Sequence, residues 1–190
     1  MTKGPLDLVH QVAQILDDLD IPYALGGSMA SSLFGEPRST VDVDIAIRLA
    51  TDRADAFLER AEAEFYVPVD AARAAVEAQT SFNLLDTKCG LKVDLFVLGE
   101  GPLDRMQIDR RIKVAIPGID GGIWVTSPEV QVLRKLDWYL KGGSVSDRQW
   151  RDVVGILRTT RALDTGYLLE AARTIGLHDL LAVALDQAGS

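Results

Sequence analysis

Two periods of apolar residues alternate along this chain, and they predict where its helices and strands lie. Spacings of three and four residues over 5–19 predict a helix, because residues at these spacings share one helical face. Alternation of apolar and polar residues over 41–47 predicts a strand with one apolar face. By the same reasoning we expect further helices over 29–34, 51–64 and 71–79, the last capped by Asp70, and strands over 22–25, 82–86, 91–98, 112–116 and 122–125.

From residue 127 onward the helical period takes over. We expect helices over 128–140, 147–159, 164–175 and 178–187. A mixed part followed by an all-helical part predicts an α/β (α+β) fold, with a mixed central sheet flanked by helices over 1–126 and a C-terminal helical bundle over 127–190 packed on it. Within this sheet the run 91–98 is apolar almost throughout, which predicts a central strand buried on both faces.

Aspartates interrupt the two most strand-like segments. Asp42 and Asp44 are two residues apart in one strand, so they project from the same face about 7 Å apart, and Asp94 lies in the other. Mg²⁺ binds one or two carboxylates and completes its shell with water and phosphates. Two such ions about 4 Å apart assist an in-line displacement at phosphorus. We therefore predict Asp42, Asp44 and Asp94 as catalytic residues and as ligands of Mg²⁺, most simply two ions, with Mn²⁺ as a substitute.

A solvated face of an edge strand would also explain an Asp-x-Asp pair. Two observations favour a functional interpretation of all three acids together. Aspartate is disfavoured in strands, yet it recurs in both segments. Asp94 also has Val, Leu and Phe as neighbours, among which an unpaired carboxylate would be costly to bury.

A glycine turn precedes the acids. Gly26, Gly27 and Ser28 lie between a short strand and the start of a helix, where backbone N–H groups attract anions and glycine lets a phosphate approach closely. The simpler interpretation is an ordinary strand–helix turn, with Ser28 as the helix cap. No Gly-Lys-Ser follows, which excludes a P-loop.

Together these motifs resemble the nucleotidyltransferase superfamily of DNA polymerase β. The resemblance is carried by residues 25–30, by residues 37–44 and by the later strand residue Asp94. Within the superfamily, the first two segments are similar to a small bacterial branch that includes AbiEii-type toxins. Residues 127–139 and 148–152 resemble the helical Lys…Arg…Asp segment of that branch.

The resemblance implies a magnesium-dependent enzyme that transfers the NMP group of an NTP to an acceptor and releases pyrophosphate. It implies that Gly26, Gly27 and Ser28 hold the triphosphate. It also implies that the paired aspartates hold the metal ions and that Asp94 completes the catalytic site.

The same resemblance gives Lys135 a contact with the phosphates, and Arg148 and Asp152 a supporting role. Helical periodicity allows simpler roles. Lys135 lies beside an apolar stripe and would face solvent, and Arg148 and Asp152 would form an i,i+4 pair worth about 0.2–0.5 kcal/mol. Arg38, in a loop before the acids, would either steady a phosphate by bidentate hydrogen bonds or pair with one of the aspartates.

Charge and cysteine content limit the expected acceptors and the expected location of the protein. The 190 residues include 20 Lys and Arg against 28 Asp and Glu, a formal net charge of −8. Non-specific nucleic-acid binding needs cations that neutralise phosphates, so this charge favours a small molecule or protein over a tRNA end as acceptor. No run approaches the roughly 20 apolar residues of a membrane span, and a single cysteine, Cys89, excludes an internal disulfide. We expect a cytoplasmic protein without a membrane partner.

Three functions remain open. The first is a nucleotidyltransferase with an NTP as substrate and a small molecule, a protein or a tRNA end as acceptor; a toxin of this kind would have an antitoxin partner. The second is a non-catalytic nucleotide-binding or interaction module, for which loss of an acid would be the signature, yet all three are present. The third is a metal-dependent phosphodiesterase or nuclease, which hydrolyses its substrate with the same two-metal geometry.

Overall fold

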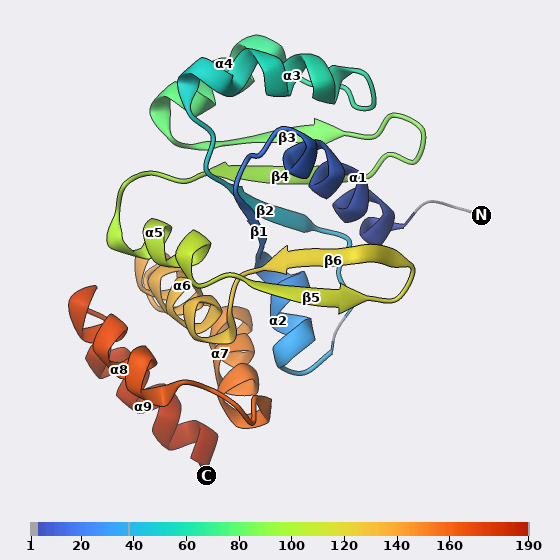
Figure 1. The fold of residues 1–190 in the computed structure, drawn as a ribbon. Coiled ribbons are helices and arrows are strands. Elements are labelled where there is room, and N and C mark those ends of the chain that lie inside the picture. Colours follow the sequence, from blue (N-terminus) through green and yellow to red (C-terminus); the bar gives the residue numbers. More distant parts are fainter. Residues whose placement is uncertain (1–3, 38, 190) are drawn as a thin grey trace.

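The computed structural model describes residues 4–37 and 39–189, and the strands in these ranges form one six-stranded sheet (Figure 1). The strands are β1 Tyr23–Leu25, β2 Val43–Ile47, β3 Ser81–Leu85, β4 Lys92–Val97, β5 Ile112–Ile116 and β6 Ile119–Val125. Their order in the sheet is β3-β4-β2-β1-β6-β5. The pairs β2–β4 and β1–β6 are parallel and the other neighbours are antiparallel, so the predicted mixed sheet is confirmed.

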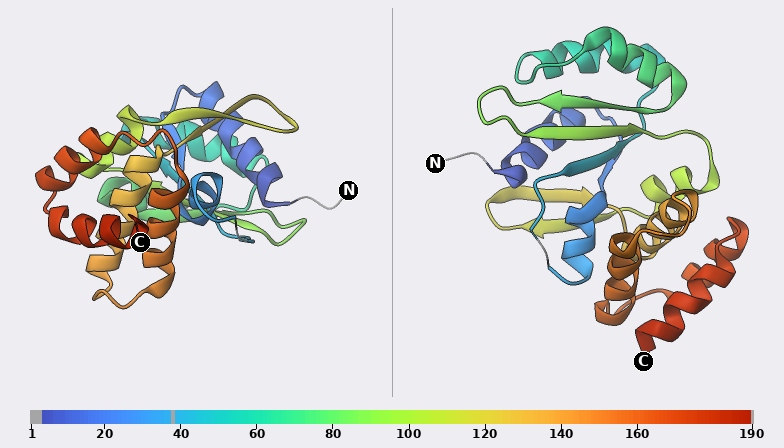
Figure 2. Two further views of the ribbon diagram at one scale, coloured as in Figure 1. Left: turned by 90° about the horizontal axis from the view of Figure 1, so that it is seen from below. Right: turned by 180° about the vertical axis from the view of Figure 1, so that it is seen from behind.

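Helices surround the sheet. They are α1 Pro5–Asp18, α2 Gly27–Phe34, α3 Ala54–Glu62 (after a 3₁₀ turn, Thr51–Arg53), α4 Val69–Ala78, α5 Pro102–Asp109, α6 Pro128–Lys141, α7 Asp147–Thr159, α8 Thr165–Thr174 and α9 His178–Gly189. Helix α1 packs against β1, β2 and β6, while α4 packs on β3 at one edge of the sheet. The C-terminal helices α6 to α9 gather beside the sheet, next to α2 and α5 (Figures 1 and 2).

Buried apolar side chains form two main clusters. The first joins the sheet to α1, α3 and α4, and the second joins α5 to the C-terminal helices. Phe34 at the end of α2 packs against both clusters. Because Leu103 of α5 belongs to the second cluster, that cluster reaches back before residue 127. The division of the chain at 126/127 stays a prediction.

Several local predictions need correction. Helix α5 was not expected, although Gly101 before Pro102, with Asp104 in the first turn, is a helix-start signal. Ser28 is not a cap: α2 begins at Gly27, so Ser28 lies inside its first turn. Asp70 likewise lies within the first turn of α4 rather than at its cap.

The prediction that the strand over 91–98 is buried on both faces is wrong. In β4 the residues Val93, Leu95 and Val97 are buried, while those between them face the other side of the sheet and are partly exposed. The second face is therefore open, and it carries Asp94. None of the helices in the described ranges is long and apolar enough to cross a membrane.

Candidate active site

The acidic residues meet where β2 and β4 run side by side. In the parallel register Val43 is opposite Val93 and Asp44 is opposite Asp94, so both carboxylates project from the same face of neighbouring strands. Such strands lie about 4.8 Å apart. Asp42 immediately precedes β2 and is exposed. Segments 50 residues apart in sequence thus place three carboxylates on one surface.

Burial and neighbouring negative charge disfavour ionisation of Asp44. Burial of its side chain raises the pKa of Asp44, and the neighbouring carboxylates of Asp94 and Asp42 raise it further. The cations Lys135 and Lys92 act in the opposite direction. Positive charge brought to this surface would therefore stabilise the ionised form of Asp44.

Lys92 is an unforeseen member of the acidic surface. Its Nζ lies 2.9 Å from Oδ1 and 2.6 Å from Oδ2 of Asp94, and this hydrogen bonding raises the pKa of Lys92. A lysine two residues before an aspartate in a strand faces the same side, so the sequence did contain this signal. The Lys92 side chain is 51 % exposed, so it can turn away into solvent.

The glycine turn touches Asp44 directly. Gly26 donates its backbone N–H to the carbonyl oxygen of Asp44 at 2.8 Å. Gly27 has φ +57°, and a Cβ atom built on it would lie 1.8 Å from Oδ2 of Asp44. The positive φ and the close approach of Asp44 both require glycine at position 27, since an L side chain would be strained there and would collide with the carboxylate. The start of α2 is consequently held against the acidic surface.

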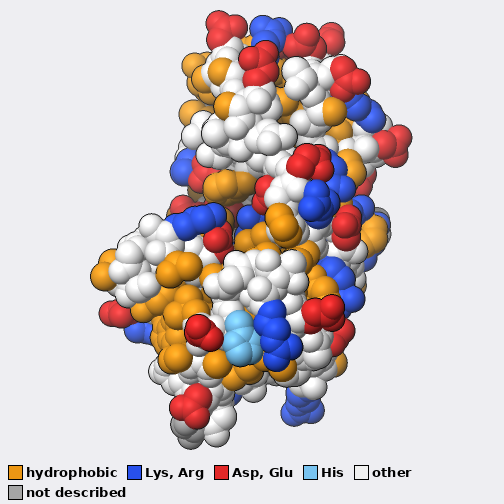
Figure 3. Space-filling view, turned by 90° about the vertical axis from the view of Figure 1, so that its left-hand side faces the viewer, with side chains coloured by type: hydrophobic (Ala, Val, Ile, Leu, Met, Phe, Trp, Pro, Cys, Tyr) orange, Lys and Arg blue, Asp and Glu red, His pale blue; other side chains and the backbone are white. Residues whose placement is uncertain are grey.

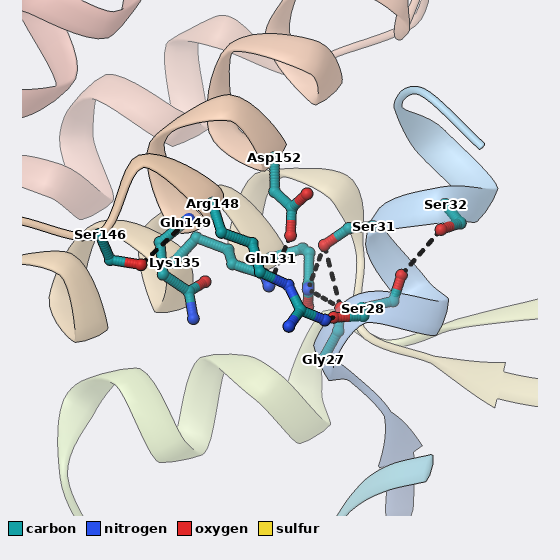
Figure 4. Close-up of polar contacts among 10 residues, drawn as sticks. All are labelled: Gly27, Ser28, Ser31, Ser32, Gln131, Lys135, Ser146, Arg148, Gln149 and Asp152. Carbon is teal, nitrogen blue, oxygen red and sulfur yellow. Dashed lines mark hydrogen bonds and ion pairs between the residues drawn. The ribbon is translucent and has the colours of Figure 1, made fainter. Parts of the chain in front are cut away.

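Side chains from α6 and α7 fasten this turn from the other side (Figure 4). Arg148 of α7 donates from Nη2 to Oγ of Ser28 at 3.2 Å. Gln131 of α6 donates from Nε2 to the carbonyl oxygen of Gly27 at 2.7 Å and to Oγ of Ser31 at 2.9 Å. Gln131 was not foreseen, because a single glutamine in an apolar helix has no distinctive pattern.

Lys135 and Asp152 form a buried ion pair between α6 and α7 (Figure 4). The Lys135 Nζ lies 2.9 Å from Oδ2 of Asp152, and the two side chains are 2 % and 8 % exposed. The interpretation of Lys135 as a solvent-exposed residue is therefore wrong. Burial follows from the packing of α7 on α6, which helical periodicity alone does not show.

These groups surround a cavity, which we call the front cavity. It is lined from the sheet by Asp42, Asp44, Asp94 and Lys92, and from the helices by Ser28, Lys135 and Arg148. Gly27 also lines it, while Asp152 supports Lys135. Gly26 lines the neighbouring cavity. Arg38 lies outside the described residues. The structure thus brings the predicted site residues of the described ranges together, and their individual roles stay predictions.

The chemistry of the acidic surface fits Mg²⁺. Within the described ranges, no three Asp, Glu, His or Cys side chains are already gathered as a metal site. Mg²⁺ needs only one or two protein carboxylates, because water and substrate phosphates supply its other oxygens. Asp44 and Asp94, opposite each other in the register, can provide these two once Lys92 turns away.

Comparison with known proteins identifies the fold. No protein-family model matches the sequence, and no curated protein matches it. Among solved structures, the chain is similar to an antigenic nucleotidyltransferase-like protein from Paracoccidioides brasiliensis, with 23% identity, a TM-score of 0.58, and coverage of 97% of this chain and 93% of the other. The fold is that of nucleotidyltransferase-like proteins.

Two further structures share this fold. The antibiotic-resistance factor ANT(2″)-Ia is 13% identical with a TM-score of 0.53, over 96% of each chain. A candidate nucleotidyltransferase from Thermotoga maritima is 16% identical with a TM-score of 0.51, over 76% of this chain and 91% of that one. The narrower assignment to the branch with AbiEii-type toxins stays a prediction.

Proposed function

We propose that the protein is a magnesium-dependent nucleotidyltransferase that moves the NMP group of an NTP to an acceptor and releases pyrophosphate. The observation that carries the proposal is the direct contact between Gly27 and Asp44. It holds the start of a helix, where backbone N–H groups attract phosphate, against a pair of carboxylates that can bind a metal. The acceptor is a small molecule, a protein or the end of a tRNA.

In the front cavity, phosphate binding would belong to the helix side and metal binding to the sheet side. The N–H groups at the start of α2, together with Arg148 and Lys135, would bind the β- and γ-phosphates, because they supply donors and positive charge on the helix side. The carboxylates of Asp42, Asp44 and Asp94 would hold the metal on the sheet side. Bound Mg²⁺ would neutralise charge on the phosphates and favour ionisation of the attacking hydroxyl. Asp94, opposite Asp44, would accept the proton from that hydroxyl.

Transfer of label from α-labelled NTPs into a fractionated cell extract tests the proposal. With Mg²⁺ present, we expect label in one fraction and release of pyrophosphate, and the fraction identifies the acceptor as RNA, protein or small molecule. Asp44→Asn removes a metal ligand with little change in volume and should abolish transfer. Asp55→Asn makes the same chemical change at an exposed position of α3 and should leave transfer unchanged.

The other outcomes discriminate the competing functions. NTP binding without transfer to any fraction would support a non-catalytic nucleotide-binding module. The ion pair between Lys92 and Asp94 gives that alternative a structural basis, since it occupies a carboxylate that the metal needs. Hydrolysis of phosphodiesters without use of an NTP would instead support the phosphodiesterase.

A toxin role with an antitoxin partner rests on the sequence resemblance alone, and the proposed cytoplasmic location rests on the single cysteine. If the protein is a toxin, its expression should arrest bacterial growth, and the Asp44→Asn variant should not. Growth that is equally slow with both proteins would refute a catalytic toxin.

A further inference from the structure

A second cavity, the rear cavity, adjoins the front cavity along the same two strands. The front cavity is lined by Asp42, just before β2, and by Asp44 of β2, whereas the rear cavity is lined by Asp44 and Ala46 of β2. On β4 both cavities include Phe96, and Leu98 after the strand lines only the rear one. The rear cavity has a volume of about 270 Å³. Asp44 therefore lies at the boundary between two adjoining spaces.

The charges in the rear cavity are balanced within the protein. Arg134 of α6 forms an ion pair with Asp104 of α5 and donates from Nε to Oε1 of Gln107 at 2.6 Å. Gln107 in turn donates from Nε2 to Oγ1 of Thr126 at 3.0 Å. The Arg134 side chain is only 14 % exposed, so this network forms a fixed wall. Apart from Asp44, the described residues thus present no uncompensated charge to this space.

The other lining residues of the rear cavity include two aromatic and two hydroxyl-bearing side chains. The rings of Phe96 and Trp138 lie with their centroids 6.0 Å apart, and both residues line the cavity. Thr80 and Ser81, both exposed, also line it. Figure 3 shows this side of the molecule, where the surface is recessed between the part around α3 and α4 and the part formed by the C-terminal helices. The recess gives a small ligand access from solvent.

The stereochemistry of phosphoryl transfer assigns different reactants to the two cavities. In an in-line displacement, the attacking oxygen approaches phosphorus from the side opposite the leaving group. Lys135, Arg148 and Lys92 all line the front cavity, so pyrophosphate would leave there. With the α-phosphorus held at Asp44, the attacking hydroxyl would come from the rear cavity.

We propose that the rear cavity binds the acceptor, and that the acceptor is a small uncharged molecule with a hydroxyl group and an aromatic or apolar face. This inference rests on the proposed nucleotidyltransferase function. The acceptor oxygen forms a bond to the α-phosphorus while the bond from that phosphorus to the bridging oxygen breaks. Pyrophosphate leaves with the bonding electrons, and the hydroxyl proton passes to the carboxylate pair of Asp44 and Asp94, since Asp44 lines both cavities.

Charge disfavours nucleic-acid and polycationic acceptors in this cavity. A nucleic-acid acceptor requires cations for its phosphates, and the cation here, Arg134, is already paired. A polycationic acceptor requires several free carboxylates, whereas Asp104 is held by the same arginine and only Asp44 remains among the described lining residues. An uncharged molecule can stack on Trp138 and hydrogen-bond to Thr80 and Ser81 without these requirements.

Binding measured by NMR tests this inference. The probes are 4-nitrophenyl β-glucoside (neutral, hydroxylated and aromatic), kanamycin (polycationic) and a short oligoadenylate RNA, each added with Mg²⁺ and the best-binding α,β-methylene NTP analogue. The signal observed is the indole N–H of Trp138, assigned by Trp138→Phe. We expect only the glucoside to shift it. Ser81→Trp fills the exposed rim and should weaken glucoside binding by at least about tenfold, whereas the matched Ser81→Thr should not. Neither change should alter binding of the NTP analogue.

Different results would contradict the acceptor class, the assignment of the rear cavity and the proposed function. A shift with kanamycin or RNA alone, or with no probe, overturns the uncharged acceptor. A Ser81→Trp variant that binds the NTP analogue at least about tenfold more weakly overturns the acceptor assignment, because the rear cavity would then hold the nucleoside. If the wild-type protein binds none of the α,β-methylene analogues of ATP, CTP, GTP and UTP, the proposed function itself is refuted, and the inference with it.

Discussion

On the sheet side of the front cavity, Asp44 and Asp94 lie opposite each other with like charge, whereas on the helix side Lys135 and Asp152 form a buried pair of opposite charge. Burial, together with the first arrangement, raises the pKa of Asp44, and nearby lysines lower it only in part. The second satisfies both partners within the folded chain. The sheet side therefore has capacity for an external cation, whereas the charges of Lys135 and Asp152 balance each other. Breaking this buried pair should affect stability first, and changes on the sheet side should affect function first.

The largest effect on stability is expected from Asp152→Asn. The change removes the carboxylate that pairs with Lys135, a residue only 2 % exposed. Breaking a buried ion pair costs about 3–5 kcal/mol, so the free energy of unfolding in urea should fall by about that amount. Asp137→Asn is the matched control, since it breaks an exposed i,i+4 pair with Lys141 and should cost less than about 0.5 kcal/mol. Equal losses in the two variants would contradict the contrast.

Asp44→Asn should have the opposite result, with a large loss of activity and no loss of stability. Loss of a charge that stabilises the transition state slows an enzyme by about 10²- to 10³-fold or more, which the rate of pyrophosphate release would report. The melting temperature should stay the same or rise, because burial and neighbouring carboxylates already disfavour this charge in the folded state. A variant that unfolds at a lower temperature would show that Asp44 is part of the structural framework.

Gly27→Ala tests the contact between Gly27 and Asp44, which joins the helix side of the front cavity to its sheet side. Alanine would be strained at φ +57° and its Cβ would displace the Asp44 carboxylate, so we expect a loss of about 1–3 kcal/mol in stability together with reduced pyrophosphate release. Gly90→Ala is the control, because φ there is +72° but no atom lies within 4 Å of an added Cβ. Gly90→Ala should lose stability and keep its activity. Retained activity in both variants would separate the glycine turn from catalysis.

Lys92→Met should give the smallest change in stability. Its pair with Asp94 is half exposed, and such surface pairs contribute about 0–1 kcal/mol. The change frees a carboxylate opposite Asp44, so Mn²⁺, followed by its EPR signal, should bind several-fold more tightly. Weaker Mn²⁺ binding would indicate that Lys92 helps to assemble the metal site.

The sequence predicted the sheet side of the site more fully than the helix side. The strands over 41–47 and 91–98 were expected, and a period of two places Asp42 with Asp44 whatever the rest of the fold does. The glycine turn was also expected, but the contact between Gly27 and Asp44 depends on the pairing of β1 with β2. Lys92 was overlooked, although the same period of two places it beside Asp94.

Helix periodicity was less informative about individual side chains. It correctly predicted α6 and α7 near their observed bounds. It misplaced Lys135 in solvent, because the exposure of a residue beside an apolar stripe is decided by which helix packs there. Helix α5, whose Asp104 and Gln107 line the rear cavity, was missed altogether. The rear cavity consequently had no counterpart in the predictions.

By itself the sequence determined the local properties of this protein: the order of the strands and of the helices other than α5, the shared face of Asp42 and Asp44, and a glycine turn before them. These follow from backbone periods and from the conformations each residue allows, which act over a few neighbouring positions. Only the tertiary structure decided that Asp94 is opposite Asp44, that Lys135 is buried against Asp152, and that two cavities meet at Asp44. Each of these joins segments far apart in the chain, and their pairing is set by the packing of the whole core.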